Sequence, residues 1–294
     1  MSLVSRYLDP NLVERLNHME LSARSVVEGS TIGLHRSPIK GASVEFRQHR
    51  FYTPGDELRR LDWRVLARTD RPYIKEYDEE TNLRSMLLLD ASGSMSYTRQ
   101  YGSKFDAAAR IAASLSYLML RQTESVGMAT YADKLGYYLA PHGGSSQLSR
   151  VIDQLERSNP SGISNLPSAV QEVADRLGRR GLVIVLSDFF APLQQIREAF
   201  ARLNYERHET ICLQVIDPDE QDFPFRNWSR FRGLEGEPPM LAEPAMVRKA
   251  YLENFQRHQQ QLTETCRSMR IEHHIYTTST PLLDWLTKVL SRRS

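Results

Sequence analysis

Two segments of the sequence each contain an uninterrupted apolar run that leads to an aspartate. In "SMLLLDASGSMS" (85–96), four apolar residues run into Asp90, and in "GLVIVLSDFF" (181–190) a similar run leads to Asp188. A run without polar alternation is typical of a strand buried on both faces, as in a parallel sheet. We therefore predict that both aspartates lie at the carboxyl ends of buried parallel strands.

The rest of the chain after residue 83 alternates between predicted strands and predicted helices. Ser103 to Asp106 resembles a capping box, and the apolar residues that follow it recur at helical spacing. This alternation predicts an α/β fold, with a mostly parallel sheet covered by helices on both faces, in which ligands bind outside the carboxyl ends of the strands. The expected strands are 83–90, 126–132, 135–140, 182–188, 210–217 and 271–278, and further helices are expected over 146–156, 165–177, 191–204, 243–269 and 281–291, with an irregular stretch over 218–240.

The N-terminal part of the chain has a different pattern. Asp9-Pro10 predicts a helix start, and the segment 41–80 mixes β-formers with charges around a Pro54-Gly55-Asp56 turn, which predicts strands joined by a hairpin. We therefore expect two parts: 1–80, an N-terminal helix and β-rich segment, and 81–294, the α/β domain. Between His35 and Lys75, basic residues outnumber acidic ones, which indicates either an ion-paired surface or a partner-facing patch.

Composition limits the classes of function. The 294 residues carry a formal net charge of +2, so nothing points to nucleic acid as a partner. Two cysteines, Cys212 and Cys266, fit free thiols in a reducing compartment better than a disulfide framework. No apolar run has the length of a signal peptide or of a membrane span. We expect a cytoplasmic protein without a membrane span.

Residues 90–94 put one carboxylate and two hydroxyls on a short loop, as Asp90-x-Ser92-x-Ser94. Asp188 adds a second carboxylate from another strand end, and Ser164, in "SGISN" before a predicted helix, adds a third hydroxyl. Such hard oxygen donors suit Mg²⁺ first, with Mn²⁺ and Ca²⁺ as alternatives. Because hydroxyls are neutral ligands, the cation keeps positive charge for a partner's carboxylate.

This pattern resembles the metal-ion-dependent adhesion site of von Willebrand factor A domains. In that family, two acids and hydroxyl residues from three loops bind a divalent cation, and a partner's carboxylate completes its shell. The resemblance implies that Asp90, Ser92 and Ser94 are ligands from the first loop and that Asp188 is the acid of the third. The middle loop usually offers threonine, and here Ser164 stands in its place.

A segment upstream of Asp90 indicates a more specific family. "GASVEFRQHRFYTPGDELRRLDWRVLARTDRPYIKEYDEE" is similar to the signature of the bacterial "domain of unknown function 58" family. The likeness extends over roughly residues 30–290 and implies a von Willebrand factor A-like domain preceded by a β-rich segment. Members are often encoded beside a MoxR-type AAA+ ATPase. The resemblance therefore implies a non-enzymatic interaction module that serves as adaptor or co-chaperone of such an ATPase.

A metal-dependent hydrolase, either a phosphatase or a peptidase, is the alternative. Aspartyl phosphotransferases usually place a second acid two residues after the nucleophile, where this chain has Ser92. A serine hydrolase needs a nucleophile elbow and a histidine, and "ASGS" lacks the first glycine in register. His142 is the nearest candidate base, and His273 and His274, adjacent in a predicted strand, would point to opposite faces. The sequence therefore predicts no catalytic residue.

Overall fold

The structure, a computed structural model, describes residues 6–8, 10–18, 44–53, 61–79, 84–178 and 180–291. It divides the chain into two compact units. The smaller unit is Leu34–Asn82, and the larger unit comprises Met1–Gly33 and Leu83–Ser294. The candidate site lies in the larger unit.

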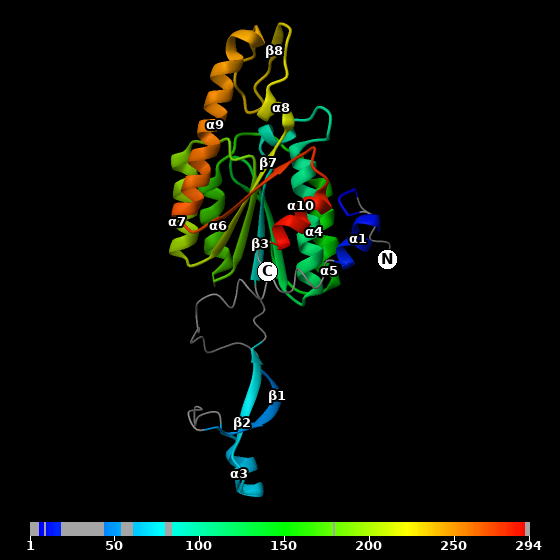
Figure 1. Cartoon of the computed structure of the whole chain (residues 1–294), viewed down its shortest axis with the longest axis vertical. Helices are drawn as coiled ribbons and strands as arrows, with labels where there is room; N and C mark the ends of the chain where they lie inside the picture. Colours follow the sequence, from blue (N-terminus) through cyan, green and yellow to red (C-terminus); the bar gives the residue numbers. More distant parts are fainter. Residues whose placement is uncertain are drawn as a thin grey trace. The chain divides into compact units, whose positions relative to one another are not determined.

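The larger unit is built on a six-stranded sheet with the order β10-β7-β6-β3-β4-β5 (Figure 1). Of its neighbouring pairs only β4 and β5 are antiparallel, so the predicted α/β fold with a mostly parallel sheet is confirmed. β3 lies inside the sheet, which is why its apolar run has no polar alternation. The strands are β3 (Arg84–Asp90), β4 (Ser125–Tyr131), β5 (Leu135–His142), β6 (Leu182–Ser187), β7 (Glu209–Ile216) and β10 (Glu272–Thr277).

Helices cover both faces of this sheet (Figure 1). One hydrophobic core takes Leu87 and Leu89 of β3, and the other takes Met86 and Leu88, as the two-residue repeat of a strand requires. No helix in the described ranges is long and apolar enough to cross a membrane. The first core is covered by α1 (Pro10–His18), α4 (Lys104–Arg121), α5 (Ser145–Arg157) and α10 (Leu282–Ser291), the second by α6 (Leu166–Leu177), α7 (Leu193–Tyr205) and α9 (Pro244–Ser268).

Two helix ends predicted from the sequence are present in the structure. The Ser103 side chain caps α4 by accepting a hydrogen bond from the backbone N–H of Asp106 at 3.0 Å. Gly178 ends α6 with a φ of +67°, a conformation that glycine adopts without a steric penalty. Cys212 and Cys266 lie buried as free thiols in the second core, which agrees with their sparse use in the sequence.

The smaller unit contains β1 (Val44–Phe51), α3 (Trp63–Thr69) and β2 (Tyr73–Glu79). β1 and β2 pair antiparallel, so the β-rich character is as predicted. The Pro54-Gly55-Asp56 turn lies outside the described residues. The expectation of strands joined by a hairpin over 41–80 is wrong at Asp62, which caps a helix: its carboxylate accepts hydrogen bonds from the backbone N–H of Arg64 at 3.0 Å and of Val65 at 3.3 Å.

The N-terminal helix does not group with this β-rich unit. We expected residues 1–80 to form one N-terminal part, but Leu12 and Leu16 of α1 are buried in the first core of the larger unit. The apolar face of this amphipathic helix contacts α4 and α10.

Residues 218–240, which we expected to be irregular, belong instead to a small folded element, residues 218–242, that we call the hairpin lobe. It contains α8 (Pro218–Asp222) and two short antiparallel strands, β8 (Ser229–Phe231) and β9 (Met240–Ala242). Phe223 of the lobe packs with its ring centroid 4.7 Å from that of Tyr251 of α9. The lobe lies beyond the carboxyl ends of the sheet strands (Figure 1).

Glu124, at the start of β4, provides a first test of the energetics. Its side chain is buried, its Oε2 has no hydrogen-bond partner within the described structure, and burial raises its pKa to about 7. The folded state therefore favours the protonated acid, and stability is lost as pH rises through about 7. We expect Glu124→Gln to stabilise the protein by about 1–3 kcal/mol at alkaline pH and to have little effect at acidic pH. Urea unfolding of wild type and Glu124→Gln at an alkaline and an acidic pH measures this difference in stability. An equal difference at both pH values would contradict the prediction.

Candidate functional site

The loop after β3 presents the predicted first-loop residues. Asp90 is fully buried, and its Oδ1 accepts a hydrogen bond from the backbone N–H of Ser92 at 2.8 Å. The hydroxyl oxygens of Ser92 and Ser94 lie 3.1 Å apart at the start of η2 (Gly93–Ser96), a short 3₁₀ turn. Ser96 instead donates its hydroxyl to the carbonyl of Gly93 at 2.6 Å, so it holds the turn together.

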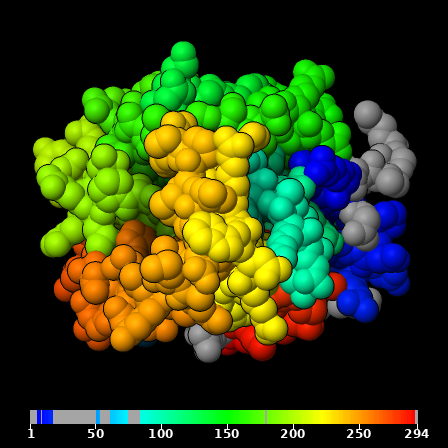
Figure 2. Space-filling model, turned by 90° about the horizontal axis from the view of Figure 1, so that it is seen from above, coloured from blue at the N-terminus to red at the C-terminus, as the bar shows by residue number. Residues whose placement is uncertain are grey.

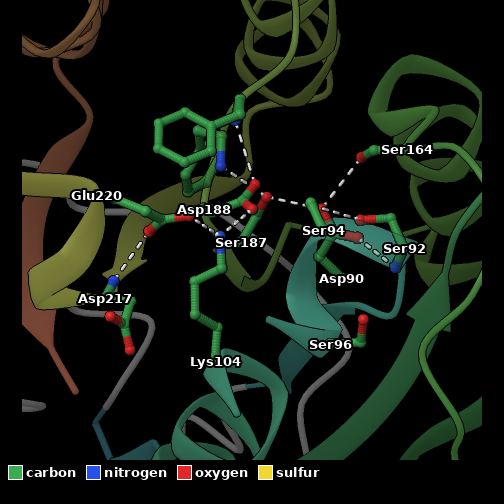
Figure 3. Close-up of polar contacts among 12 residues, drawn as sticks. Asp90, Ser92, Ser94, Ser96, Lys104, Ser164, Ser187, Asp188, Asp217 and Glu220 are labelled. Carbon is green, nitrogen blue, oxygen red and sulfur yellow. Dashed lines mark hydrogen bonds and ion pairs between the residues drawn. The ribbon is translucent and has the colours of Figure 1, made fainter. Parts of the chain in front are cut away.

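The other carboxylate oxygen of Asp90 accepts hydrogen bonds from the hydroxyl groups of three further segments, and Figure 3 shows two of these residues, Ser164 and Ser187. Its Oδ2 accepts from Ser187 at the end of β6 at 2.7 Å, from Ser164 at 3.0 Å and from Tyr131 at the end of β4 at 3.1 Å. Sequence-distant segments therefore meet at Asp90. Ser94 and Ser164 are half-buried, which places the open side of the site between them.

The first and second loops are also joined through their backbones. The N–H of Gly93 donates to the carbonyl of Gly162, and the N–H of Ser161 donates to the carbonyl of Ala91, both at 2.8 Å. These two bonds fix the "SGISN" segment against the "DASGS" segment. The hydroxyl of Ser164 is held in position by its own loop as well as by Asp90.

Asp188 follows β6 directly and is buried, but its carboxylate has a partner that the sequence did not suggest (Figure 3). Its Oδ2 lies 2.7 Å from Nζ of Lys104, and its Oδ1 accepts from the backbone N–H of Phe190 at 3.2 Å. The same ammonium lies 2.5 Å from Oε1 of Glu220 in α8. Lys104, whose side chain is 1% exposed, thus links the third loop to the hairpin lobe.

The charges of this cluster perturb one another. Burial and the neighbouring charge of Asp188 raise the pKa of Asp90 to about 6, although the hydrogen bonds from Ser187 and Ser92 oppose the shift. Burial disfavours the charged form of Lys104, but Asp188 and Glu220 outweigh it and hold its pKa above the usual value. Three carboxylates and one ammonium leave a formal charge of −2, which favours a further cation.

The donor set fits a hard divalent cation and not a soft one. Within the described residues, no group of three or more His, Cys, Asp or Glu is placed to hold a metal ion. A cation at this site would therefore need serine hydroxyls as well as Asp90 and Asp188. Carboxylate and hydroxyl oxygens, with positions left for water, suit Mg²⁺.

Four polar residues of this cluster escaped the sequence analysis: Tyr131, Ser187, Lys104 and Glu220. One of them carries a signal in the sequence. Lys104 is the first residue of α4, where the helix dipole disfavours a cation, so a lysine at this position indicates nearby acids. The other three are recognisable only once the sheet order is known.

The candidate histidines have partners elsewhere. His142 is exposed and contacts the carbonyl of Gly143 through Nδ1. His273 contacts Gln214, and burial lowers its pKa to about 4, while His274 contacts Glu272. Within the described ranges, no contact of these side chains reaches Asp90 or Asp188.

Gly93 is the point where the hairpin lobe meets the first loop. A Cβ at this position would lie 1.9 Å from the carbonyl oxygen of Leu234, in the loop between β8 and β9. We therefore expect Gly93→Ala to displace that loop and to destabilise the protein by about 1–3 kcal/mol, as overpacking does. Hydrogen exchange should become faster over 229–242. Gly143→Ala, whose Cβ would make only ordinary contact, is the control, and equal exchange in both variants would contradict the packing.

Comparison with known proteins gives one family match and several relatives. The family model described as "Protein of unknown function DUF58" matches residues 48–261. The uncharacterized protein Rv1480 of Mycobacterium tuberculosis and the uncharacterized protein Mb1516 of Mycobacterium bovis are each 29% identical over 221 residues, covering 74% of this chain and 68% of the relative.

Solved structures with a similar arrangement include the conserved hypothetical protein BatB from Bacteroides thetaiotaomicron. It has 15% identity and a TM-score of 0.44, with coverage of 72% of this chain and 98% of that one. An aerotolerance-related membrane protein from Bacteroides fragilis has 16% identity and a TM-score of 0.46, with the same coverage. The SpRpn10 VWA domain has 12% identity and a TM-score of 0.43, covering 70% and 95%.

Proposed function

Since the chain belongs to the DUF58 family, we propose that it is a non-enzymatic protein-interaction module that binds a divalent cation and, through it, a partner's carboxylate. One observation supports this most directly. Hydroxyls from separate loops converge on the buried carboxylate of Asp90, at the sheet edge where ligands of parallel sheets bind.

The residues that would hold the cation are Asp90, Ser92, Ser94, Ser164 and Asp188. A bound cation would supply a positive charge that attracts an anionic ligand. Asp90 and Asp188 provide the negative charge, while the three hydroxyls provide neutral oxygens that leave part of the cation's charge unbalanced. Lys104 partly neutralises the carboxylate of Asp188, so more of the cation's positive charge is left for a partner.

The partner we propose is a MoxR-type AAA+ ATPase, for which this cytoplasmic protein would act as adaptor or co-chaperone. A partner carboxylate that replaces water at a site shielded by loops gains a charge-assisted contact. The basic stretch between Arg47 and Lys75 would steer an acidic partner, an effect that salt would screen.

A binding titration tests this proposal. A MoxR-type ATPase encoded nearby is titrated against wild type in Mg²⁺, wild type in EDTA, Ser92→Ala/Ser94→Ala and Asp188→Ala. Ser96→Ala is the matched control, because its hydroxyl serves the turn rather than the site. We expect strong binding only for wild type in Mg²⁺ and for the control. Equal affinity in every sample would remove the cation from the mechanism.

The alternative function is that of a metal-dependent hydrolase acting on phosphate esters or peptides. Screening phosphatase and peptidase substrates in Mg²⁺ and Mn²⁺ discriminates between the two. Turnover that is lost in Asp90→Asn would favour the hydrolase and contradict the interaction module.

A further inference from the structure

The hairpin lobe has a small aromatic core of its own, so its surface is held in a defined shape. The ring centroids of Phe223 and Phe225 lie 5.1 Å apart, and each lies within 5.7 Å of that of Phe231. The Tyr251 hydroxyl of α9 donates to the carbonyl of Glu220 at 3.1 Å. The lobe is therefore packed on α9 and is not a loose connection.

Large apolar side chains nevertheless remain exposed on and beside the lobe. Trp228 is 65% exposed, Leu241 66% and Met246 78%, and Leu234 and Met240 are exposed as well. Arg230 and Leu241 are directly opposite each other in the β8–β9 pair, so they share a face. Several large exposed apolar side chains on one short folded element are typical of a surface that binds another molecule.

Positive charge accompanies these apolar side chains. Arg226, Arg230 and Arg232 are exposed, and none has an ion pair within the part of the chain that the structure describes. Two of the three acids of α8 are already engaged, since Asp219 pairs with Arg99 and Glu220 pairs with Lys104, whereas Asp222 is exposed. The three arginines are free to pair with acids of a binding partner.

The lobe adjoins the candidate cation site directly. The carbonyl oxygen of Leu234 lies against Gly93 of the first loop, and Glu220 shares Lys104 with Asp188. Figure 2, which looks onto this end of the larger unit, shows the yellow lobe between α9 in orange and the blue-green segment that follows β3. One bound segment can therefore reach both the cation site and the lobe.

We infer that the hairpin lobe is the docking surface for a protein segment in which an acidic residue is flanked by apolar side chains. This inference rests on the proposed function, because the acidic residue is the one that the cation receives. The apolar neighbours pack on Trp228 and Leu241, and further acids pair with the arginines. A uniformly anionic partner, such as nucleic acid or a lipid surface, would also meet Glu235 and Glu237 in the loop between β8 and β9, so charge complementarity favours a mixed protein segment.

Selection of peptides on the purified full chain tests this inference. A random peptide library is selected in Mg²⁺, and individual peptides are then titrated by fluorescence anisotropy. We expect selected peptides to combine acidic with aromatic or aliphatic residues. Trp228→Ser/Leu241→Ser should bind them at least about tenfold more weakly. Tyr205→Ser, which removes an exposed aromatic ring from α7, is the matched control and should bind as wild type does.

The outcomes separate the two proposals. If the lobe variant loses binding while EDTA and Asp90→Asn leave it unchanged, the docking surface stands and the cation's role fails. If EDTA abolishes binding while the lobe variant, verified as folded by its Tm, binds normally, the docking surface is wrong. The docking surface would also be wrong if the selected peptides lacked acidic residues or lacked apolar residues. Binding of anionic vesicles or an oligonucleotide in preference to the peptides would also overturn it.

Discussion

Replacement of Lys104 by methionine is expected to destabilise the larger unit by about 3–5 kcal/mol, because it leaves two buried acids without their counter-charge. Asp188 and Glu220 lie 2.7 Å and 2.5 Å from the ammonium. Burial already raises the pKa of Glu220, and without the ammonium its carboxyl group would bind a proton more tightly still in the folded state. The loss should therefore be largest at alkaline pH and smaller at acidic pH, where Glu220 is neutral. Denaturant unfolding in EDTA at two pH values measures it.

Matched variants isolate the cause of that loss. Lys134→Met removes an exposed lysine and should change the free energy of unfolding by less than about 0.5 kcal/mol. The double variant Lys104→Met/Glu220→Gln lacks one of the two buried carboxylates that Lys104 neutralised. It should therefore be more stable than Lys104→Met alone, because the two sites are coupled. A loss below about 1 kcal/mol in Lys104→Met would show that the cluster is not a buried ion pair.

Asp90→Asn should have opposite effects with and without cation. The folded pKa of Asp90, about 6, lies above its ordinary value, so the ionised carboxylate costs stability as pH rises from about 4 to 7. In EDTA at alkaline pH the variant should therefore be at least as stable as wild type. In Mg²⁺, wild type should gain stability through binding, whereas the variant should gain none, with affinity lower by at least about 100-fold.

The thermal midpoint in EDTA and in excess Mg²⁺ measures both effects. Asp133→Asn, in the β4–β5 turn, is the control: its side chain is exposed, and the variant should gain stability in Mg²⁺ as wild type does. An equal gain for Asp90→Asn and wild type would place the cation elsewhere.

The sequence was most informative where one local signal decides the structure. The apolar run before Asp90 has no polar position, so only a strand buried on both faces accommodates it, and β3 is that strand. Ser103 and Gly178 mark helix ends through their own backbone chemistry, independent of the rest of the fold. Where β-forming residues competed with a capping aspartate, at Asp62 and Trp63, the cap decided the outcome and the strand prediction was wrong.

The remaining features depend on tertiary packing. Lys104 meets Asp188 and Glu220 because α4, β6 and α8 converge at one edge, which residue spacing does not reveal. The hairpin lobe looked irregular because its strands are short and are separated by a loop rich in glycine and proline, whereas packing of the rings of Phe223, Phe225 and Phe231 gives it order. The hydroxyl of Ser187 joins Asp90 only because β6 lies beside β3.

Cation binding to the metal-depleted full chain tests the central claim most directly. Calorimetric titration with Mg²⁺ or Mn²⁺ should give one site in wild type and in Ser96→Ala, whose hydroxyl only closes the 3₁₀ turn. Ser92→Ala/Ser94→Ala should bind at least about tenfold more weakly, because two oxygen donors beside Asp90 are lost. Equal affinity in all three proteins, or no binding by wild type, would contradict the claim that these residues form a divalent-cation site.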